Sequence, residues 1–85
     1  MTEKVWHVYV LRCGDDTLYT GITTDVQARL STHRSGKGAK YTRGRLPLEL
    51  VYEEVCEGKS QALKRELAIK ALSREEKEQL IKTRL

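Results

Sequence analysis

The chain has 85 residues, of which 39% are hydrophobic and 33% are charged, with a formal net charge of +4. This length is enough for one domain with a single modest core, and the composition is unlike that of a disordered or collagen-like protein. No apolar run approaches the ~20 residues that cross a bilayer, and MTEKVWHVYV lacks the layout of a secretory signal. We therefore expect one domain over residues 1–85, with its core in 6–81, in a monomeric cytoplasmic protein that does not bind membranes. Cys13 and Cys56 are then expected to stay reduced and to pack as small apolar groups.

Three segments have the composition of β-strands. Residues 6–13 and 17–23 are rich in β-branched and aromatic side chains, and the turn residues GDD at 14–16 separate them. Because this connection is so short, the two strands must be antiparallel. The loop 35–47 has three glycines and the only proline, and residues 48–56 predict a third strand.

Helices are predicted after the second and third strands. The segment TDVQ at 24–27 has the pattern of a capping box with Thr24 as N-cap, so a helix is expected to run to about Arg34. Residues 60–72 have a strong helical pattern, with Ser60 as the expected N-cap.

A second capping box, Ser73 with Glu76, predicts a last short helix that ends at about Ile81. The predicted order of elements is therefore β-β-α-β-α-α. Three strands with interleaved helices indicate an α/β fold in the broad sense, here an α+β sandwich.

One segment of the chain carries the whole excess of positive charge. Between Asp25 and Glu49 there is no acidic residue, whereas the rest of the chain has ten basic and twelve acidic residues. The six basic residues of this segment are Arg29, Arg34, Lys37, Lys40, Arg43 and Arg45. Such a block indicates a polyanionic partner, nucleic acid first, although an ordinary solvated surface is the alternative. The GKGAK stretch at 36–40 lacks the spacing of a P-loop, but its amides and lysines are suited to a backbone phosphate.

Two tyrosines of the hairpin are candidates for a shared site. If residues 14–16 form the loop, Tyr9 faces Gly21, and Tyr9 and Tyr19 project from the same face with space beside them. A two-residue loop would instead place them on opposite faces. The alternative to a site is a pair of ordinary core or surface aromatics whose hydroxyls are hydrogen-bonded.

Arg29 and His33 are one helical turn apart, so their side chains are neighbours. Beside two phenols they would suit a phosphate, which Arg29 would hold with two hydrogen bonds while His33 relays a proton. The alternatives are an exposed ion pair between Arg29 and Asp25, and a solvent-facing His33.

Glu66 is a carboxylate in an apolar part of its helix. A helical projection places it between Ala62 and Leu63, with Ile69 on its other side. A carboxylate there needs a partner, which is either Lys70, one turn on, or a divalent metal ion. One carboxylate suits Mg²⁺, which keeps most of its waters and takes substrate phosphate oxygens as further ligands.

Together these positions resemble the GIY-YIG nuclease domain. HVY at 7–9 corresponds to the first tripeptide of that family and YTG at 19–21 to the second. The phrase YTGITTDVQARLSTH carries the arginine and histidine of the family as Arg29 and His33, and Glu66 matches its metal-binding glutamate. SGKGAKYTRG resembles a loop of the small, single-domain bacterial branch, so the resemblance covers nearly the whole chain.

The resemblance implies a small three-stranded antiparallel sheet flanked by helices. It also implies hydrolysis of phosphodiester bonds with one Mg²⁺ or Mn²⁺ ion, held by Glu66. Tyr19 would be the general base, and Tyr9 would assist it or orient the phosphate. Arg29 would stabilise the pentacovalent phosphorus, and His33 would help proton transfer or position the phosphate.

The chain also departs from the family. His7 replaces the glycine of the first tripeptide, Val8 replaces its isoleucine, and Thr20 fills the variable middle position of the second. Many family nucleases use an asparagine near the end of the domain, but this chain contains no asparagine. We expect no appended DNA-binding module, so targeting is expected to come from the basic loop or from a separate protein partner.

The function expected from the sequence is a metal-dependent DNA endonuclease of low sequence specificity, with selectivity for DNA structure or a role in DNA repair as finer expectations. The residues expected to contact the substrate are Gly21, Lys37, Lys40, Tyr41 and Arg43, with the ring of Tyr41 available to stack on an exposed base. The alternatives are a nucleic-acid-binding module with weak or no catalysis and a protein-interaction domain on a nuclease fold.

Overall fold

The order of secondary-structure elements matches the predicted β-β-α-β-α-α order. The computed structural model describes residues 5–83. Its elements are β1 (Trp6–Arg12), β2 (Leu18–Thr23), α1 (Val26–Arg34), a 3₁₀ turn η1 (Lys40–Thr42), β3 (Glu49–Cys56), α2 (Lys59–Lys70) and α3 (Arg74–Lys82).

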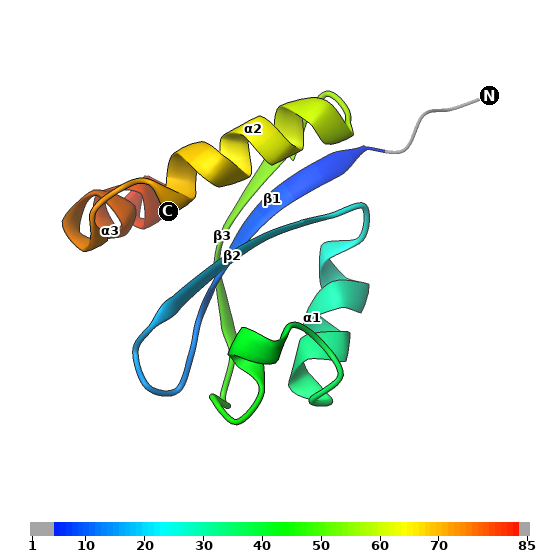
Figure 1. Cartoon of the computed structure of the whole chain (residues 1–85), viewed down its shortest axis with the longest axis vertical. Coiled ribbons are helices and arrows are strands. Elements are labelled where there is room, and N and C mark those ends of the chain that lie inside the picture. The colour runs from blue at the N-terminus through cyan, green and yellow to red at the C-terminus, as the bar shows by residue number, and fades with distance from the viewer. Residues whose placement is uncertain (1–4, 84–85) are drawn as a thin grey trace.

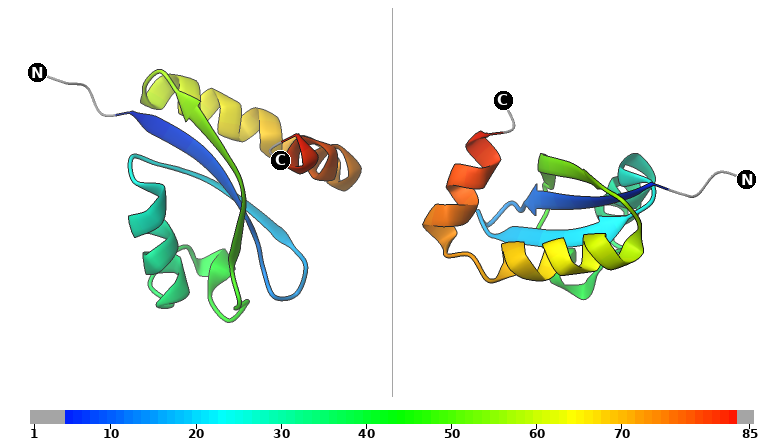
Figure 2. Two further views of the ribbon diagram at one scale, coloured as in Figure 1. Left: turned by 180° about the vertical axis from the view of Figure 1, so that it is seen from behind. Right: turned by 90° about the horizontal axis from the view of Figure 1, so that it is seen from above.

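The three strands form one antiparallel sheet in the order β2-β1-β3. Helix α1 covers one face of the sheet, and α2 with α3 covers the other (Figures 1 and 2). The predicted α+β fold with a small antiparallel sheet between helices is therefore confirmed.

The loop of the β1–β2 hairpin has the three residues Gly14-Asp15-Asp16. The backbone N–H of Cys13 donates to the carbonyl of Thr17 at 2.8 Å, which closes the hairpin. Asp16 has φ 67°, in the left-handed region that Asp tolerates better than most side chains. Of the two loop lengths considered, the structure has the one that places the tyrosines on the same face.

Each face of the sheet has its own small core. Next to α2 and α3, the buried side chains are Val8, Val10, Tyr52, Cys56, Ala62 and Ile69. Next to α1, they are Tyr9, Leu11, Cys13, Val26, Leu30 and Leu48. Alternate residues of β1 thus enter opposite cores, as the two-residue period of a strand requires.

A β-bulge in β3 allows that strand to contribute to both cores. Val10 pairs with Tyr52 and the next residue, Leu11, pairs with Leu50, so Val51 is the extra residue. Leu50 and Tyr52 are two apart and would share a face of a regular strand. The bulge instead directs Leu50 to the α1 side and Tyr52 to the α2 side.

The prediction that Thr24 caps α1 was wrong. The N-cap is Asp25, whose carboxylate accepts from the N–H of Ala28 at 3.0 Å. Its own N–H donates to the hydroxyl of Thr23 at 3.1 Å. An anion at this end also interacts favourably with the helix dipole, so Asp25 is the better cap of two adjacent candidates.

Ser60 is not an N-cap either. Helix α2 begins one residue earlier, after Gly58, whose φ of 105° is not accessible to most side chains. The prediction for α3 is confirmed, because Ser73 accepts from the N–H of Glu76, and the Glu76 carboxylate accepts from the N–H of Ser73.

Both cysteines are buried, and neither forms a disulfide. Burial raises the pKa of the Cys56 thiol, which keeps it in the neutral form. Within residues 5–83, no helix has the length and apolar character needed to span a bilayer.

Candidate functional site

The side chains of Tyr9 and Tyr19 lie together on the α1 side of the sheet. Tyr9 pairs with Gly21 and Leu11 with Tyr19, as the three-residue loop predicts. The two phenol rings have centroids 6.3 Å apart and an interplanar angle of 50°. The Tyr9 residue is only 2% exposed, whereas Tyr19 is half-buried.

Gly21 provides the space into which the ring of Tyr9 extends. A Cβ atom at this position would lie 2.6 Å from the hydroxyl oxygen of Tyr9 and 2.8 Å from its Cζ. Real Cβ atoms do not approach other atoms so closely. The tyrosine can therefore lie across β2 only because residue 21 has no side chain.

His33 is the buried polar centre of the site. Its residue exposure is 0%, so the alternative of a solvent-facing histidine is wrong. Its Nε2 is hydrogen-bonded to the hydroxyl of Tyr9 at 2.9 Å, and its Nδ1 to the hydroxyl of Thr42 at 2.9 Å. The imidazole also meets the ring of Tyr19 edge to face, with 5.3 Å between centroids. His33 thus joins both tyrosines to the loop that follows α1.

Part of the basic loop encloses His33. Gly38 is buried, and a Cβ there would lie 2.3 Å from the Nδ1 atom of His33. The side chain of Thr42, 1% exposed, contacts the same nitrogen and also donates to the carbonyl of Ala39 at 2.9 Å. The GKGAK stretch was predicted to present its amides to a phosphate, but its central glycine packs on the histidine.

Burial favours the neutral forms of both Tyr9 and His33, which are hydrogen-bonded to each other. It raises the pKa of Tyr9 to about 12, although the guanidinium of Arg29 acts in the opposite direction. Burial also lowers the pKa of His33, and the positive charge of Arg29 adds to that effect. The pair is therefore a phenol and a neutral imidazole near pH 7.

The charge of Arg29 affects the pKa values of Tyr9 and His33, and Arg29 does not form an ion pair with Asp25 within the described residues. The Asp25 carboxylate caps α1. The guanidinium instead lowers the pKa of Tyr9, against the larger effect of burial. The structure thus brings Arg29 and His33 to the same phenol.

Glu66 lies at the margin of the core on the other side of the sheet. Ala62 and Ile69 are fully buried, but Leu63 is 42% exposed, so the apolar arc is narrower than predicted. The Glu66 side chain is 16% exposed, and its carboxylate lies 3.2 Å from the Nζ of Lys70. The partner considered as the ordinary alternative is thus present, while the Glu66 charge also acts on Tyr9.

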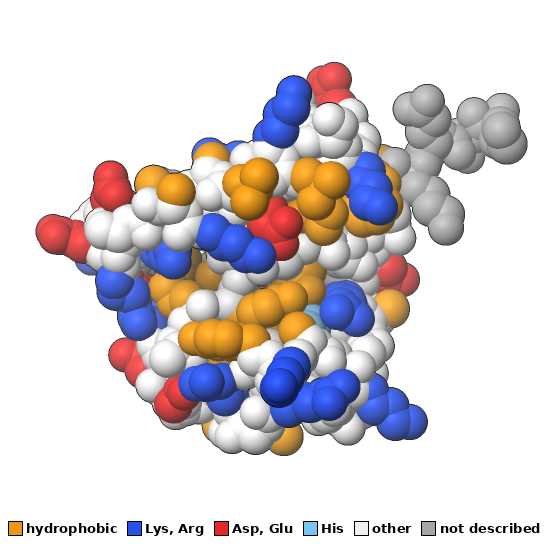
Figure 3. All heavy atoms as spheres, in the orientation of Figure 1, with side chains coloured by type: hydrophobic (Ala, Val, Ile, Leu, Met, Phe, Trp, Pro, Cys, Tyr) orange, Lys and Arg blue, Asp and Glu red, His pale blue; other side chains and the backbone are white. Residues whose placement is uncertain are grey.

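The basic loop is exposed where it was predicted to bind a substrate. Lys37, Lys40 and Arg43 are all exposed, and Figure 3 shows blue side chains gathered around an apolar band on the face with α1 and η1. The ring of Tyr41 stacks on Tyr19 with 5.9 Å between centroids, and the guanidinium of Arg45 lies 4.3 Å from the Tyr41 ring centroid. Tyr41 is thus already engaged by two side chains, although it is 41% exposed.

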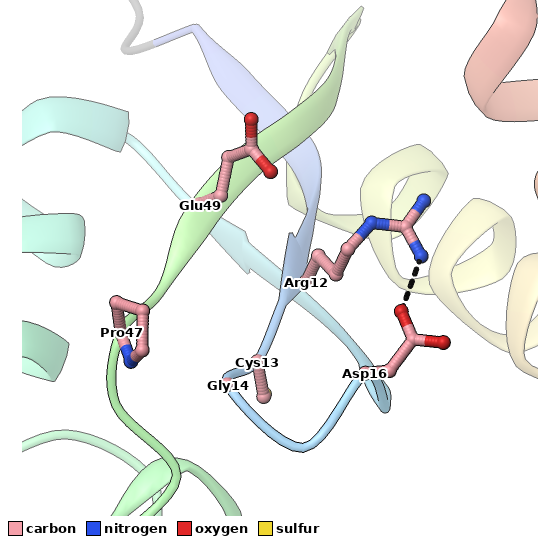
Figure 4. A pocket seen from close by; sticks show the side chains of 6 residues that line it. All are labelled: Arg12, Cys13, Gly14, Asp16, Pro47 and Glu49. Atoms are coloured by element: carbon pink, nitrogen blue, oxygen red, sulfur yellow. Dashed lines mark hydrogen bonds and ion pairs between the residues drawn. The ribbon is translucent and has the colours of Figure 1, made fainter.

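A surface hollow of about 280 Å³ lies elsewhere, between the hairpin loop and the start of β3 (Figure 4). Its lining residues are Arg12, Cys13, Gly14, Asp16, Pro47 and Glu49. None of the predicted site residues is among them, and Arg12 and Asp16 are already joined by an ion pair. The hydrogen-bonded tyrosines and histidine, rather than this hollow, are the candidate active site.

Sequence reasoning missed Thr42 and the role of Gly38. In the YT dipeptide at 41–42, only the tyrosine suggested a function. The signal for Thr42 was indirect, because a buried histidine needs partners for both ring nitrogens.

Comparison with known proteins identifies the family of the chain. The model of the GIY-YIG catalytic domain matches residues 5–79. UPF0213 protein SH2523 of Staphylococcus haemolyticus is 51% identical over 78 residues, which cover 92% of this chain and 95% of that protein. UPF0213 protein NP_0776A of Natronomonas pharaonis is 57% identical over 75 residues, which cover 88% of each chain.

Two solved structures share the fold. The solution NMR structure of the UPF0213 protein BH0048 from Bacillus halodurans has a TM-score of 0.61 and 49% identity, covering 93% of this chain and 84% of that one. The solution NMR structure of protein EF2693 from E. faecalis has a TM-score of 0.66 and 45% identity, covering 96% of this chain and 88% of that one.

Proposed function

The chain belongs to the family of the GIY-YIG catalytic domain, and from this premise we propose that it is a metal-dependent endonuclease that hydrolyses phosphodiester bonds of DNA. The observation that carries the proposal is the convergence of five functional side chains. The Tyr9 hydroxyl is hydrogen-bonded to His33, and the charges of Arg29 and Glu66 both act on it. Tyr19 lies beside it on the same face.

The reaction requires water to attack phosphorus while the bond to the leaving oxygen breaks. Tyr19 is the general base in this proposal, because it is more exposed than Tyr9 and so more accessible to a water molecule. Arg29 is placed to neutralise the charge that develops on the phosphoryl oxygens. Tyr9 and His33 orient the attacking water or the phosphate beside that base.

The donor set fits a weakly held divalent ion. Within residues 5–83 there is no cluster of three or more His, Cys, Asp or Glu side chains that would hold a metal, so Glu66 belongs to no such cluster. That suits Mg²⁺, which binds through one or two carboxylates with water and phosphate as the other ligands. When bound, such an ion would neutralise charge on the leaving oxygen. Lys70, whose side chain is half exposed, would have to release the carboxylate.

The basic loop supplies affinity rather than sequence selection. Lysines and arginines that contact phosphates bind all sequences alike, with a steep dependence on salt. Changing Lys37 and Lys40 together to alanine should weaken DNA binding uniformly and reduce the salt slope by about one unit for each phosphate that is no longer bound. A weakening confined to certain sequences would contradict this role for the loop.

The decisive experiment measures cleavage of labelled duplex, flap and branched DNA with Mg²⁺ or Mn²⁺. Tyr19→Phe and Glu66→Ala should abolish cleavage, while DNA binding in EDTA survives in Glu66→Ala. Tyr52→Phe and Glu75→Ala are matched controls, because Tyr52 lies in the other core and Glu75 is exposed on α3.

Metal-stimulated cleavage that is unchanged in Glu66→Ala would refute the role of this carboxylate. No cleavage of any substrate, with salt-sensitive binding retained, would favour the alternative of a nucleic-acid-binding module.

A further inference from the structure

Three hydrogen bonds connect Tyr9 to the backbone of the loop that follows α1. They join the Tyr9 hydroxyl to His33 Nε2, His33 Nδ1 to the Thr42 hydroxyl, and the Thr42 hydroxyl to the carbonyl of Ala39. Each of the three distances is 2.9 Å. The histidine and the threonine are both buried, so solvent does not replace either partner.

The contact of Thr42 with the Ala39 carbonyl favours one direction for each bond in this chain. A carbonyl oxygen only accepts, so in the 2.9 Å contact with Ala39 the Thr42 hydroxyl is the donor, beside the Thr42 N–H that donates to the same oxygen at 3.0 Å. Thr42 can then only accept from His33, which requires the proton of the neutral imidazole to be on Nδ1. The unprotonated Nε2 therefore accepts the proton of the Tyr9 hydroxyl.

We propose that Thr42 is a positioning residue that holds His33 as the Nδ1–H tautomer and so directs the hydroxyl proton of Tyr9 away from the substrate position. The lone pairs of the Tyr9 oxygen then face the site as hydrogen-bond acceptors for the attacking water. This proposal rests on the proposed function. It adds Thr42, a residue that sets the tautomer of His33, to the five polar residues that the family resemblance supplied.

The opposite tautomer would reverse the polarity of the site. With the proton on Nε2, His33 would donate to the Tyr9 oxygen, and the Tyr9 proton would point toward the substrate. The phenol would then offer a donor where the reaction needs an acceptor. Gly38, whose backbone lies against the imidazole, restricts the ring to the position in which Nδ1 meets Thr42.

The tautomer is measured directly by long-range ¹H–¹⁵N NMR of the ¹⁵N-labelled full chain at pH 7.5, because protonated and unprotonated ring nitrogens have well-separated shifts. Wild type should show Nδ1–H. Thr42→Val keeps the shape but removes the hydroxyl, and it should lose that preference. Thr42→Ser should retain it, as should the control Thr32→Val, whose hydroxyl bonds only to the carbonyl of Ala28.

An Nε2–H or doubly protonated His33 in the wild type overturns the proposal, even if Thr42→Val does not fold. Unchanged ring-nitrogen shifts in a folded Thr42→Val overturn it as well.

Cleavage assays test the catalytic consequence. Thr42→Val should cleave DNA at least about tenfold more slowly, since small misplacements of reacting groups have effects of this size or more, and Thr42→Ser should restore the rate. Equal rates in all variants would overturn the positioning role. If the wild type cleaves no DNA but has the Nδ1–H tautomer, the proposed function and this catalytic role fail together, while the tautomer assignment holds.

Discussion

Replacing Gly21 with alanine should destabilise the protein through one buried contact. The added Cβ would lie 2.6 Å from the hydroxyl oxygen of Tyr9, whereas unstrained carbon contacts lie at roughly 3.5 Å or more. The ring end of Tyr9 must therefore move by about 1 Å, and its 2.9 Å hydrogen bond to His33 breaks.

The size of the effect follows from three contributions. Overpacking a buried site costs about 1–3 kcal/mol, and leaving the buried hydroxyl and imidazole unpaired costs about 1–3 kcal/mol more. Alanine in a strand is favoured over glycine by roughly 0.5–1 kcal/mol, which offsets a part. We expect the free energy of unfolding of Gly21→Ala to fall by about 2–4 kcal/mol.

Urea denaturation followed by circular dichroism gives this free energy. Gly44→Ala is the matched control, because Gly44 has open space around it and a φ of 74°, so only backbone strain of about 1–2 kcal/mol applies. In a Tyr9→Phe background the closest atom, the hydroxyl oxygen, is absent, so Gly21→Ala should lower the free energy of unfolding by less. A Gly21→Ala protein as stable as wild type, or a penalty unchanged by Tyr9→Phe, would refute the reasoning.

Three further predictions concern stability, each measured by urea denaturation. Because folding lowers the pKa of His33, this residue contributes to the free energy of unfolding above about pH 6.5, and the contribution is lost on acidification. His33→Gln should therefore reduce the fall in the free energy of unfolding between pH 7.5 and 5.5. A fall equal to that of the wild type would contradict this. Ser73→Ala should lower the free energy of unfolding by about 1 kcal/mol, whereas Ser60→Ala should leave it almost unchanged. Equal effects of the two substitutions would contradict the assigned N-caps. Arg12 holds the pKa of Glu78 down to about 2 through two hydrogen bonds, so Glu78→Gln should reduce the fall in the free energy of unfolding between pH 4.5 and 2, and an unchanged fall would contradict this.

The hairpin illustrates how far local sequence reasoning extends. The strands and their turn residues were predictable from composition, but two loop lengths were compatible with the same letters. The choice depends on the positive φ of Asp16 and on the Cys13–Thr17 hydrogen bond. Tyr9 and Tyr19 share a face only because of that choice, so the site could be predicted only conditionally.

The surroundings of His33 show where such reasoning stops. A histidine on a nine-residue helix gives no local sign of burial, because its cover comes from a loop that folds back. The packing of Gly38 on the imidazole and the hydrogen bond between His33 and Thr42 depend on that return. The predicted N-cap of α1 was wrong for a different reason, since Thr24 and Asp25 are adjacent and both have suitable side chains.

The bulge at Val51 has a consequence for self-association. Strand β3 is at the edge of the sheet and presents unpaired backbone groups on its outer side, which is a template for aggregation. The bulge twists this edge, and the strand carries the charged residues Glu49, Glu53 and Glu54. Both features discourage another strand from adding there. A chain that lacks Val51 would keep Leu50 and Tyr52 on their own faces, because adjacent strand residues point to opposite sides, but it would straighten the exposed edge and so should self-associate more readily.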